Sequence, residues 1–196
     1  MNPEEIRPAL EAAIARAHRQ PDDLRAVRMV VEQAKRRGDR AVMVLRGDPR
    51  HTAFVAAGWH HSVRAEFRPR DTFAIDLVPY RRRDGVDLSE VCKVFIRHSR
   101  RIPRRTPRTF VERVALFRRI VQDRKILVVL ANADQAAQVR PFVAGAPDST
   151  VIATSTGTLG GLVTEGAEFI DLTGDHATFV NANGEPRDAQ EELTRD

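Results

Sequence analysis

A short run of apolar residues, 126–130, constrains the fold of this chain more than any other stretch. It begins directly after Lys125, and three of its five residues are β-branched. A strand that is apolar at every position is buried on both faces, as in a parallel sheet covered by helices. A short helical pattern and a second apolar run, residues 150–154, follow it, and strand, helix and strand at this spacing form a βαβ unit. The sequence therefore predicts an α/β fold, whose ligand edge lies at Ala131 and Asn132, where the first strand ends.

Composition indicates the cellular compartment in which the chain is expected. With 196 residues it is long enough to bury a full core. A single cysteine, Cys92, excludes an intrachain disulfide and is expected to be a buried apolar residue rather than a nucleophile. No apolar run reaches a membrane-spanning length, and acidic residues stand near the N-terminus, where a signal peptide needs basic ones. We therefore expect a cytoplasmic protein with no membrane partner.

The charge is unevenly distributed along the chain. Residues 1–120 hold 27 Lys and Arg against 15 Asp and Glu, whereas residues 121–196 hold 5 against 12. This asymmetry indicates a basic face.

Periodicity and capping signals predict the remaining elements. Two amphipathic helices are expected in residues 1–38, and Gly38 ends the second. We expect them to form a helical hairpin on the core. A capping box, Asp87 to Glu90, opens a further helix, and Asn183-Gly184 indicates a small hairpin. The expected strands are residues 41–45, 72–77, 126–130, 150–154 and 168–172, and a long helix is expected at 107–123.

The residues after the run 41–45 follow an expected strand, and a phosphate-binding loop occupies this place between a strand and a helix. Such a loop has the pattern G-x-x-x-x-G-K-[ST], because glycines let backbone N–H groups face the phosphates, the Lys neutralises them and the hydroxyl holds Mg²⁺. In the window 45–52, Leu45 stands at the first Gly, Arg50 at the second and His51 at the Lys. Arginine and histidine can still meet phosphates as charges. The candidate nucleotide-binding residues are therefore Arg46, Gly47, Arg50, His51 and Thr52.

The segment KILVVLANADQAAQVRPFVAGAPDSTVIATST resembles the second half of an NB-ARC domain, the nucleotide-binding module of STAND-type P-loop ATPases, in the version found in actinobacterial regulators. That family has a strand ending in Leu-Asp-Asn-Ala, a helix with Ala-Gln-Val-Arg-Pro and a strand ending in Thr-Ser-Arg. The resemblance implies a three-layer P-loop-type parallel sheet of order 2-3-4-1-5. Together with the local signals above, it gives three expected segments: a helical hairpin at residues 1–38, an NB-ARC-like domain at 39–173, and a short hairpin with an acidic tail at 174–196.

The residues that carry the family's chemistry are the ones that differ. His51 replaces the Walker A Lys, Ala131 the Walker B Asp and Thr156 the sensor Arg. Losing all three removes most of the electrostatic stabilisation that phosphoryl transfer depends on. We therefore expect no catalytic residues, no ATP hydrolysis, weak or absent binding of ADP or ATP, and no Mg²⁺ or other metal. The resemblance then implies a regulatory pseudo-NTPase, a signalling or scaffold module with a protein partner. A true NTPase with His51 in place of the Lys is the less favoured alternative.

A second function class rests on the arginine-rich segment, residues 97–108. It holds no acid, and its prolines predict a loop. The plain interpretation is a solvated linker. The alternative is a patch that binds an acidic protein or nucleic acid without nucleotide, since guanidinium groups suit phosphate. Because the segment lacks aromatic residues, single-stranded RNA is disfavoured. The candidate residues are Arg97, Arg100, Arg101, Arg104, Arg105 and Arg108.

Overall fold

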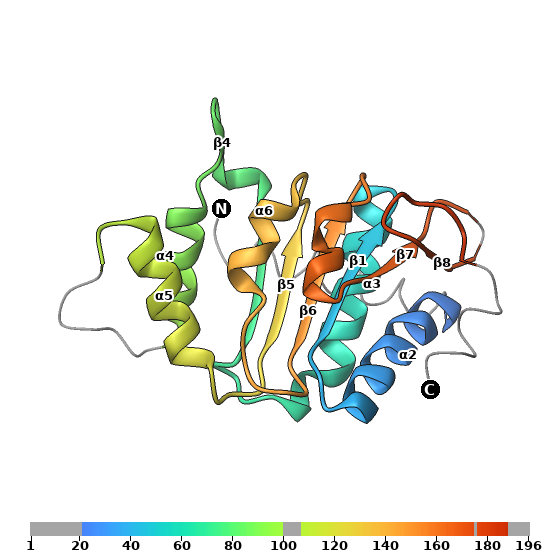
Figure 1. The fold of residues 1–196 in the computed structure, drawn as a ribbon, viewed down its shortest axis with the longest axis horizontal. Helices are drawn as coiled ribbons and strands as arrows, with labels where there is room; N and C mark the ends of the chain where they lie inside the picture. Colours follow the sequence, from blue (N-terminus) through green and yellow to red (C-terminus); the bar gives the residue numbers. More distant parts are fainter. Residues whose placement is uncertain (1–20, 100–106, 175, 188–196) are drawn as a thin grey trace.

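A twisted, mainly parallel sheet forms the centre of the protein (Figure 1). The computed structural model describes residues 21–99, 107–174 and 176–187. Across the six-stranded sheet the strands lie in the order β2 (Thr72–Asp76), β5 (Leu127–Ala131), β6 (Thr150–Ser155), β1 (Ala41–Arg46), β7 (Glu168–Asp171) and β8 (Thr178–Val180). The first five are parallel and β8 is antiparallel to β7. Numbered along the chain, the parallel strands thus follow one another as 2-3-4-1-5. The predicted α/β class is confirmed.

Helices cover both faces of the sheet and make two separate cores. On one face, α2 (Pro21–Arg37) and α3 (Pro49–Val63) pack against Met43 and Leu45 of β1. The opposite face, where Val42 and Val44 point, is covered by α4 (Leu88–His98), α5 (Phe110–Val121) and the short α6 (Ala136–Val139). The central strands are apolar at successive positions because each of their faces meets a helical layer.

Strand β5 has the burial that its sequence predicts. Leu127 and Val129 belong to the core beneath α2 and α3, while Val128 and Leu130 belong to the other core. Four phenylalanines, at positions 73, 95, 117 and 142, fill the second core, with ring centroids 5.0 to 5.9 Å apart in tilted or edge-to-face pairs. Such pairs contribute about 0.5–1.5 kcal/mol each beyond the burial of their area.

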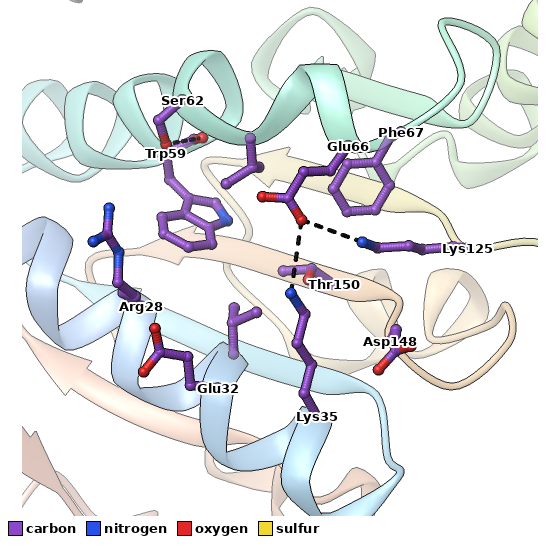
Figure 2. A pocket seen from close by; sticks show the side chains of 12 residues that line it. Arg28, Glu32, Lys35, Trp59, Ser62, Glu66, Phe67, Lys125, Asp148 and Thr150 are labelled. Atoms are coloured by element: carbon purple, nitrogen blue, oxygen red, sulfur yellow. Dashed lines mark hydrogen bonds and ion pairs between the residues drawn. The ribbon is translucent and has the colours of Figure 1, made fainter.

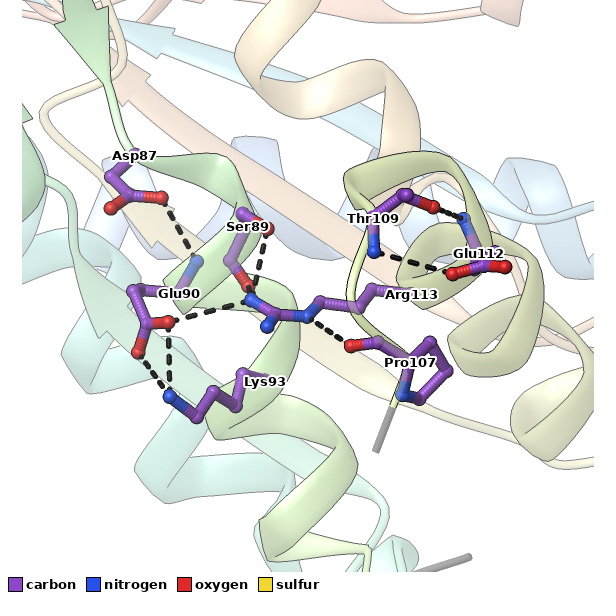
Figure 3. Close-up of polar contacts among 8 residues, drawn as sticks. All are labelled: Asp87, Ser89, Glu90, Lys93, Pro107, Thr109, Glu112 and Arg113. Atoms are coloured by element: carbon purple, nitrogen blue, oxygen red, sulfur yellow. Dashed lines mark hydrogen bonds and ion pairs between the residues drawn. The ribbon is translucent and has the colours of Figure 1, made fainter. Parts of the chain in front are cut away.

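Local signals set the helix ends. Helix α2 stops at Arg37, and Gly38 follows with a left-handed φ of 69°. The other helix of the expected hairpin falls at residues 1–20, outside the described residues, so the hairpin and the three-segment division stay predictions. The helix expected at 107–123 is shorter, because Thr109 caps α5 in a reciprocal capping box with Glu112 (Figure 3).

The remaining elements are short. The turn around Gly184, with φ 89°, brings Pro186 back to pair with Val180, so a hairpin lies where Asn183-Gly184 predicted one. A small hairpin that the sequence patterns missed projects from the body of the protein (Figure 1). Its strands are β3 (Arg81–Arg82) and β4 (Gly85–Val86), and the 3₁₀ segments are η1 (Arg64–Glu66), η2 (Val78–Tyr80), η3 (Arg140–Phe142) and η4 (Gly160–Glu165).

Arg113 ties α5 to the start of α4 (Figure 3). Its Nη1 donates to the carbonyl oxygen of Ser89 at 3.0 Å and to the hydroxyl at 2.9 Å, and its Nε donates to the carbonyl of Pro107 at 2.9 Å. Asp87 caps α4 through the Glu90 N–H at 3.1 Å. The carboxylate of Glu90 does not close the predicted capping box: it meets Lys93 at 2.9 Å and Arg113 at 3.4 Å. The hydrogen bond from Lys93 is the main reason that the pKa of Glu90 lies below its ordinary value.

We expect Arg113→Met to lower the free energy of unfolding by about 2–3 kcal/mol, because three hydrogen bonds worth about 1 kcal/mol each are lost from a side chain that is only 13% exposed. Urea denaturation followed by circular dichroism measures the change. Arg119→Met, on an exposed position of the same helix, is the matched control and should change stability by less than about 0.5 kcal/mol. Equal stability of the two variants would show that Arg113 does not hold the helices together.

Candidate functional site

Polar groups gather where the parallel strands end, at the carboxyl edge of the sheet. Asn132, directly after β5, has a left-handed φ of 61°. Its side-chain amide donates to the carboxylate of Asp76 at 2.8 Å, and its backbone N–H donates to the hydroxyl of Thr154 at 3.0 Å. These bonds join the ends of β2, β5 and β6. Open α/β sheets bind ligands at this edge, so it is the candidate functional site.

The connection between β1 and α3 consists of only two residues, Gly47 and Asp48. Leu45, at the position of the first P-loop glycine, is a fully buried strand residue in register with Thr154 and Ile170. Gly47 lies close to the backbone that follows β7, and an added Cβ would stand 3.2 Å from the carbonyl carbon of Leu172. The loop therefore takes the direct route from strand to helix and does not form the wide curve that the predicted phosphate loop requires.

Asp48 occupies the N-terminus of α3 with its own carboxylate. Its Oδ1 accepts the backbone N–H of Arg50 at 2.9 Å and that of His51 at 3.1 Å. Free N–H groups in the first turn of a helix, together with the helix dipole, are what bind a phosphate at such a position. Here a side chain of the protein already fills that role. The dipeptide Asp48-Pro49 is the sequence signal that locates this cap, since Asp favours the N-cap and Pro the first helical position.

Two of the predicted nucleotide-binding side chains on α3 already have partners within the protein. His51 reaches back to α2, where its Nε2 lies 2.9 Å from the buried carboxylate of Asp23. Thr52 is fully buried, and its hydroxyl donates to the carbonyl of Asp48 at 3.1 Å, so the group that would hold Mg²⁺ bonds to its own helix. Arg50 is exposed. Of the five candidates, only Gly47 stays in the loop itself.

Arg46 is engaged in an ion pair at the opposite side of the loop. Its guanidinium binds the carboxylate of Asp171 at the end of β7, and both side chains are mostly buried. Burial opposes ionisation of Asp171, but the bonds from Arg46 and Thr173 hold its pKa below the ordinary value. The turn at Gly184 closes over Arg46, where a Cβ would collide with the guanidinium. Arg46 therefore joins the ends of β1 and β7 beneath the C-terminal hairpin.

The other family positions lack metal ligands. Ala131 is half-buried at the end of β5, and the nearby Asp134 is held by the amide of Gln138 and lies 3.5 Å from Arg81. Among the described residues no group of three His, Cys, Asp or Glu side chains is placed to hold a metal ion.

Cys92 is fully buried on α4, as expected. Burial raises the pKa of its thiol to about 12, so the thiolate is scarce at neutral pH.

Most of the arginine-rich segment lies outside the described residues, which omit 100–106. Arg97 at the end of α4 and Arg108 just before α5 are both exposed. Arg100, Arg101, Arg104 and Arg105 belong to the omitted part, so the patch stays a sequence prediction. Within the described ranges, no helix has the length and apolar character needed to cross a membrane.

Comparison with known proteins finds regulators. The chain is 34% identical over 89 residues to the regulatory protein AfsR of Streptomyces griseus, and 35% identical over 98 residues to the regulatory protein AfsR of Streptomyces coelicolor. The matches cover 45% and 43% of this chain but only 8% and 9% of those relatives, so the chain spans less than a tenth of their length. No family model matches the sequence. Over nearly half of its length, the chain is thus similar to part of a regulatory protein.

We expect Asp48→Ala to lower the free energy of unfolding by about 1 kcal/mol, because two N–H groups of α3 lose their acceptor. Asp48→Ser is the matched control: its hydroxyl keeps a cap without the charge, and its stability should stay close to that of the parent chain. Chemical denaturation of the three proteins measures both effects. If Asp48→Ala were as stable as Asp48→Ser, the carboxylate would not be the cap of α3.

Proposed function

We propose that this chain is a regulatory module related in fold to NB-ARC domains, which acts as a scaffold for a protein partner and does not turn over nucleotide. Three observations support the proposal. The chain is similar to part of a regulatory protein, its parallel sheet has helices on both faces, and the segment of residues 125–156 resembles the second half of an NB-ARC domain.

The observation that carries the proposal is the carboxylate of Asp48 at the N-terminus of α3. A nucleotide phosphate at this position would compete with Asp48 for the same N–H groups and would add negative charge beside it. Two like charges about 4 Å apart repel by roughly 1 kcal/mol in water and about 4 kcal/mol near a protein surface. The helix dipole attracts an anion by only about 0.3–1 kcal/mol. Repulsion therefore outweighs the attraction that the helix end provides.

The neighbouring basic side chains do not reverse this balance. Arg46 is committed to Asp171 and His51 to Asp23, each through a short contact in a partly buried setting. Arg50 is exposed, and its charge acts through water, where an ion pair is worth about 0–1 kcal/mol. Binding of ADP or ATP at the loop is thus weak or absent in the proposed function, and Mg²⁺ has no carboxylate at Ala131 to hold it.

A module without a nucleotide cycle keeps one arrangement of its loop and acts by presenting a fixed surface. The Arg46–Asp171 pair and the Asp23–His51 pair both fasten the loop region to elements distant in sequence. A partner that recognises this surface would be a protein whose binding does not depend on nucleotide. This distinguishes the proposal from an ATP-driven switch.

Calorimetric titration of the full chain with ADP and with ATP, with and without Mg²⁺, tests the proposal. We expect no binding tighter than about 1 mM, which corresponds to about −4.1 kcal/mol. In Asp48→Ser, which removes the charge and keeps a cap, nucleotide affinity should rise. Submillimolar binding by the parent chain, or ATP turnover that Thr52→Ala abolishes, would establish a working nucleotide site and overturn the proposal.

A further inference from the structure

We propose that a cavity at the opposite, amino edge of the sheet binds a small aromatic carboxylate. The cavity has a volume of ≈ 280 Å³ and lies between α2, the end of α3, Lys125 just before β5 and the first residue of β6 (Figure 2). Clefts for drug-sized ligands span about 300–1,000 Å³. The cavity lies just below that range, so it suits a molecule with a single ring better than a nucleotide.

The apolar wall of the cavity is aromatic. Trp59 of α3 and Phe67, directly after η1, are 5% and 8% exposed, and both line the cavity. In Figure 2 their rings come from the same helical segment and flank the side chain of Glu66. Flat, rigid rings favour an aromatic ligand, which can stack against them offset or edge-on.

Two lysines supply the charge that an anion requires. Lys35 at the end of α2 and Lys125 just before β5 approach the same oxygen, Oε2 of Glu66, with Nζ at 3.6 and 3.3 Å (Figure 2). The Lys125 ammonium also lies 4.6 Å from the centre of the Phe67 ring. Two ammonium groups share one carboxylate, so this triad keeps one net positive charge. Lysine has three donors, and each therefore has capacity for a further acceptor.

Trp59 provides a second, independent sign of a ligand. Its indole Nε1 is buried and has no hydrogen-bond acceptor among the described residues. In Figure 2 this nitrogen is on the side of the ring that faces Glu66 and Thr150. A buried donor without an acceptor destabilises a protein. A ligand oxygen that enters beside the ring would give this N–H its partner.

The carboxylate of Glu66 marks the place that the ligand carboxylate takes. Its side chain is 50% exposed, so it can turn towards solvent as the ligand enters. In the resulting complex the ligand carboxylate bridges Lys35 and Lys125 and accepts from Trp59, while its ring lies against the aromatic wall. The lining as a whole holds three acidic and three basic side chains, so the preference for an anion comes from the two lysines that converge on one point.

Trp59 is the single tryptophan of the chain, so intrinsic fluorescence reports directly on the cavity. The full chain is titrated with phenylacetate, with its uncharged analogue phenylacetamide, and with the cation phenethylamine, and calorimetry repeats each titration. We expect saturable binding of phenylacetate that salt weakens, with affinity at least fivefold above that of either analogue. No saturable binding by both methods, or equal binding of phenylacetamide, would overturn the proposal.

Three variants separate this site from a merely structural ion pair, and circular dichroism checks that each is folded. Lys125→Met keeps the aliphatic contact but removes the charge, and should weaken phenylacetate binding about fivefold. Glu66→Gln removes the competing anion and should strengthen binding, whereas a purely structural Glu66 would leave it unchanged or weaker. Lys93→Met, whose lysine pairs with Glu90 away from the cavity, is the control and should bind as the parent chain does. Weaker binding by Glu66→Gln, or an equal loss in Lys93→Met, would contradict the assignment.

Discussion

Burial of both faces of the parallel sheet is the constraint on which the rest of this structure depends. A crossover helix joins one parallel strand to the next, and here the helices are divided between two sides, with α2 and α3 on one and α4 to α6 on the other. Each apolar strand residue thus adds to one of two cores. Met43 and Val44 of β1 are adjacent in sequence and fully buried in different cores. Because the strands cannot shift by one residue without exchanging the two faces, this burial also fixes their register.

The fixed register determines the chemistry at the carboxyl edge. Since β1 stays buried through Leu45, only Gly47 and Asp48 remain to join it to α3. A link this short brings Asp48 to the first turn of the helix, and the close approach of Leu172 to Gly47 leaves no room for a bulkier loop. The protein thus fills an anion-binding position with a carboxylate of its own. The carboxylate of Glu66 has a comparable place at the other edge, where it lies between the ammonium groups of Lys35 and Lys125.

The two edges of the sheet differ in what they can accept. At the carboxyl edge most polar groups satisfy one another: Asn132 bonds Asp76 and Thr154, and Arg46 bonds Asp171, although the Nε of Arg46 is buried without an acceptor in the described part of the chain. Near the amino edge a buried indole N–H has no acceptor, and two ammonium groups share one carboxylate. A hydrogen bond to a ligand stabilises the complex most where the donor has no partner in the free protein. A donor that already has a partner must first lose that hydrogen bond, so it favours a ligand less. The ligand is assigned to the amino edge because the unsatisfied donor of Trp59 lines a cavity together with two lysines, whereas the Arg46 guanidinium lies beneath the turn at Gly184.

The sequence by itself determined the class of fold, because that class depends on patterns within single elements. The apolar runs at 126–130 and 150–154 become β5 and β6, and the caps at Asp87 and Gly38 stand where they were predicted. Some helix ends also follow from local rules. Asp48-Pro49 is a helix-start signal that lies inside the window predicted to be a phosphate-binding loop. Tertiary structure alone decided the partners of the charged side chains. Arg46 and Asp171 are 125 residues apart, and Asp23 and His51 are 28 apart. The cavity lining converges from α2, α3, the segment before β5 and the start of β6. No periodicity encodes these pairings, since they depend on which elements the packing of the two cores brings side by side.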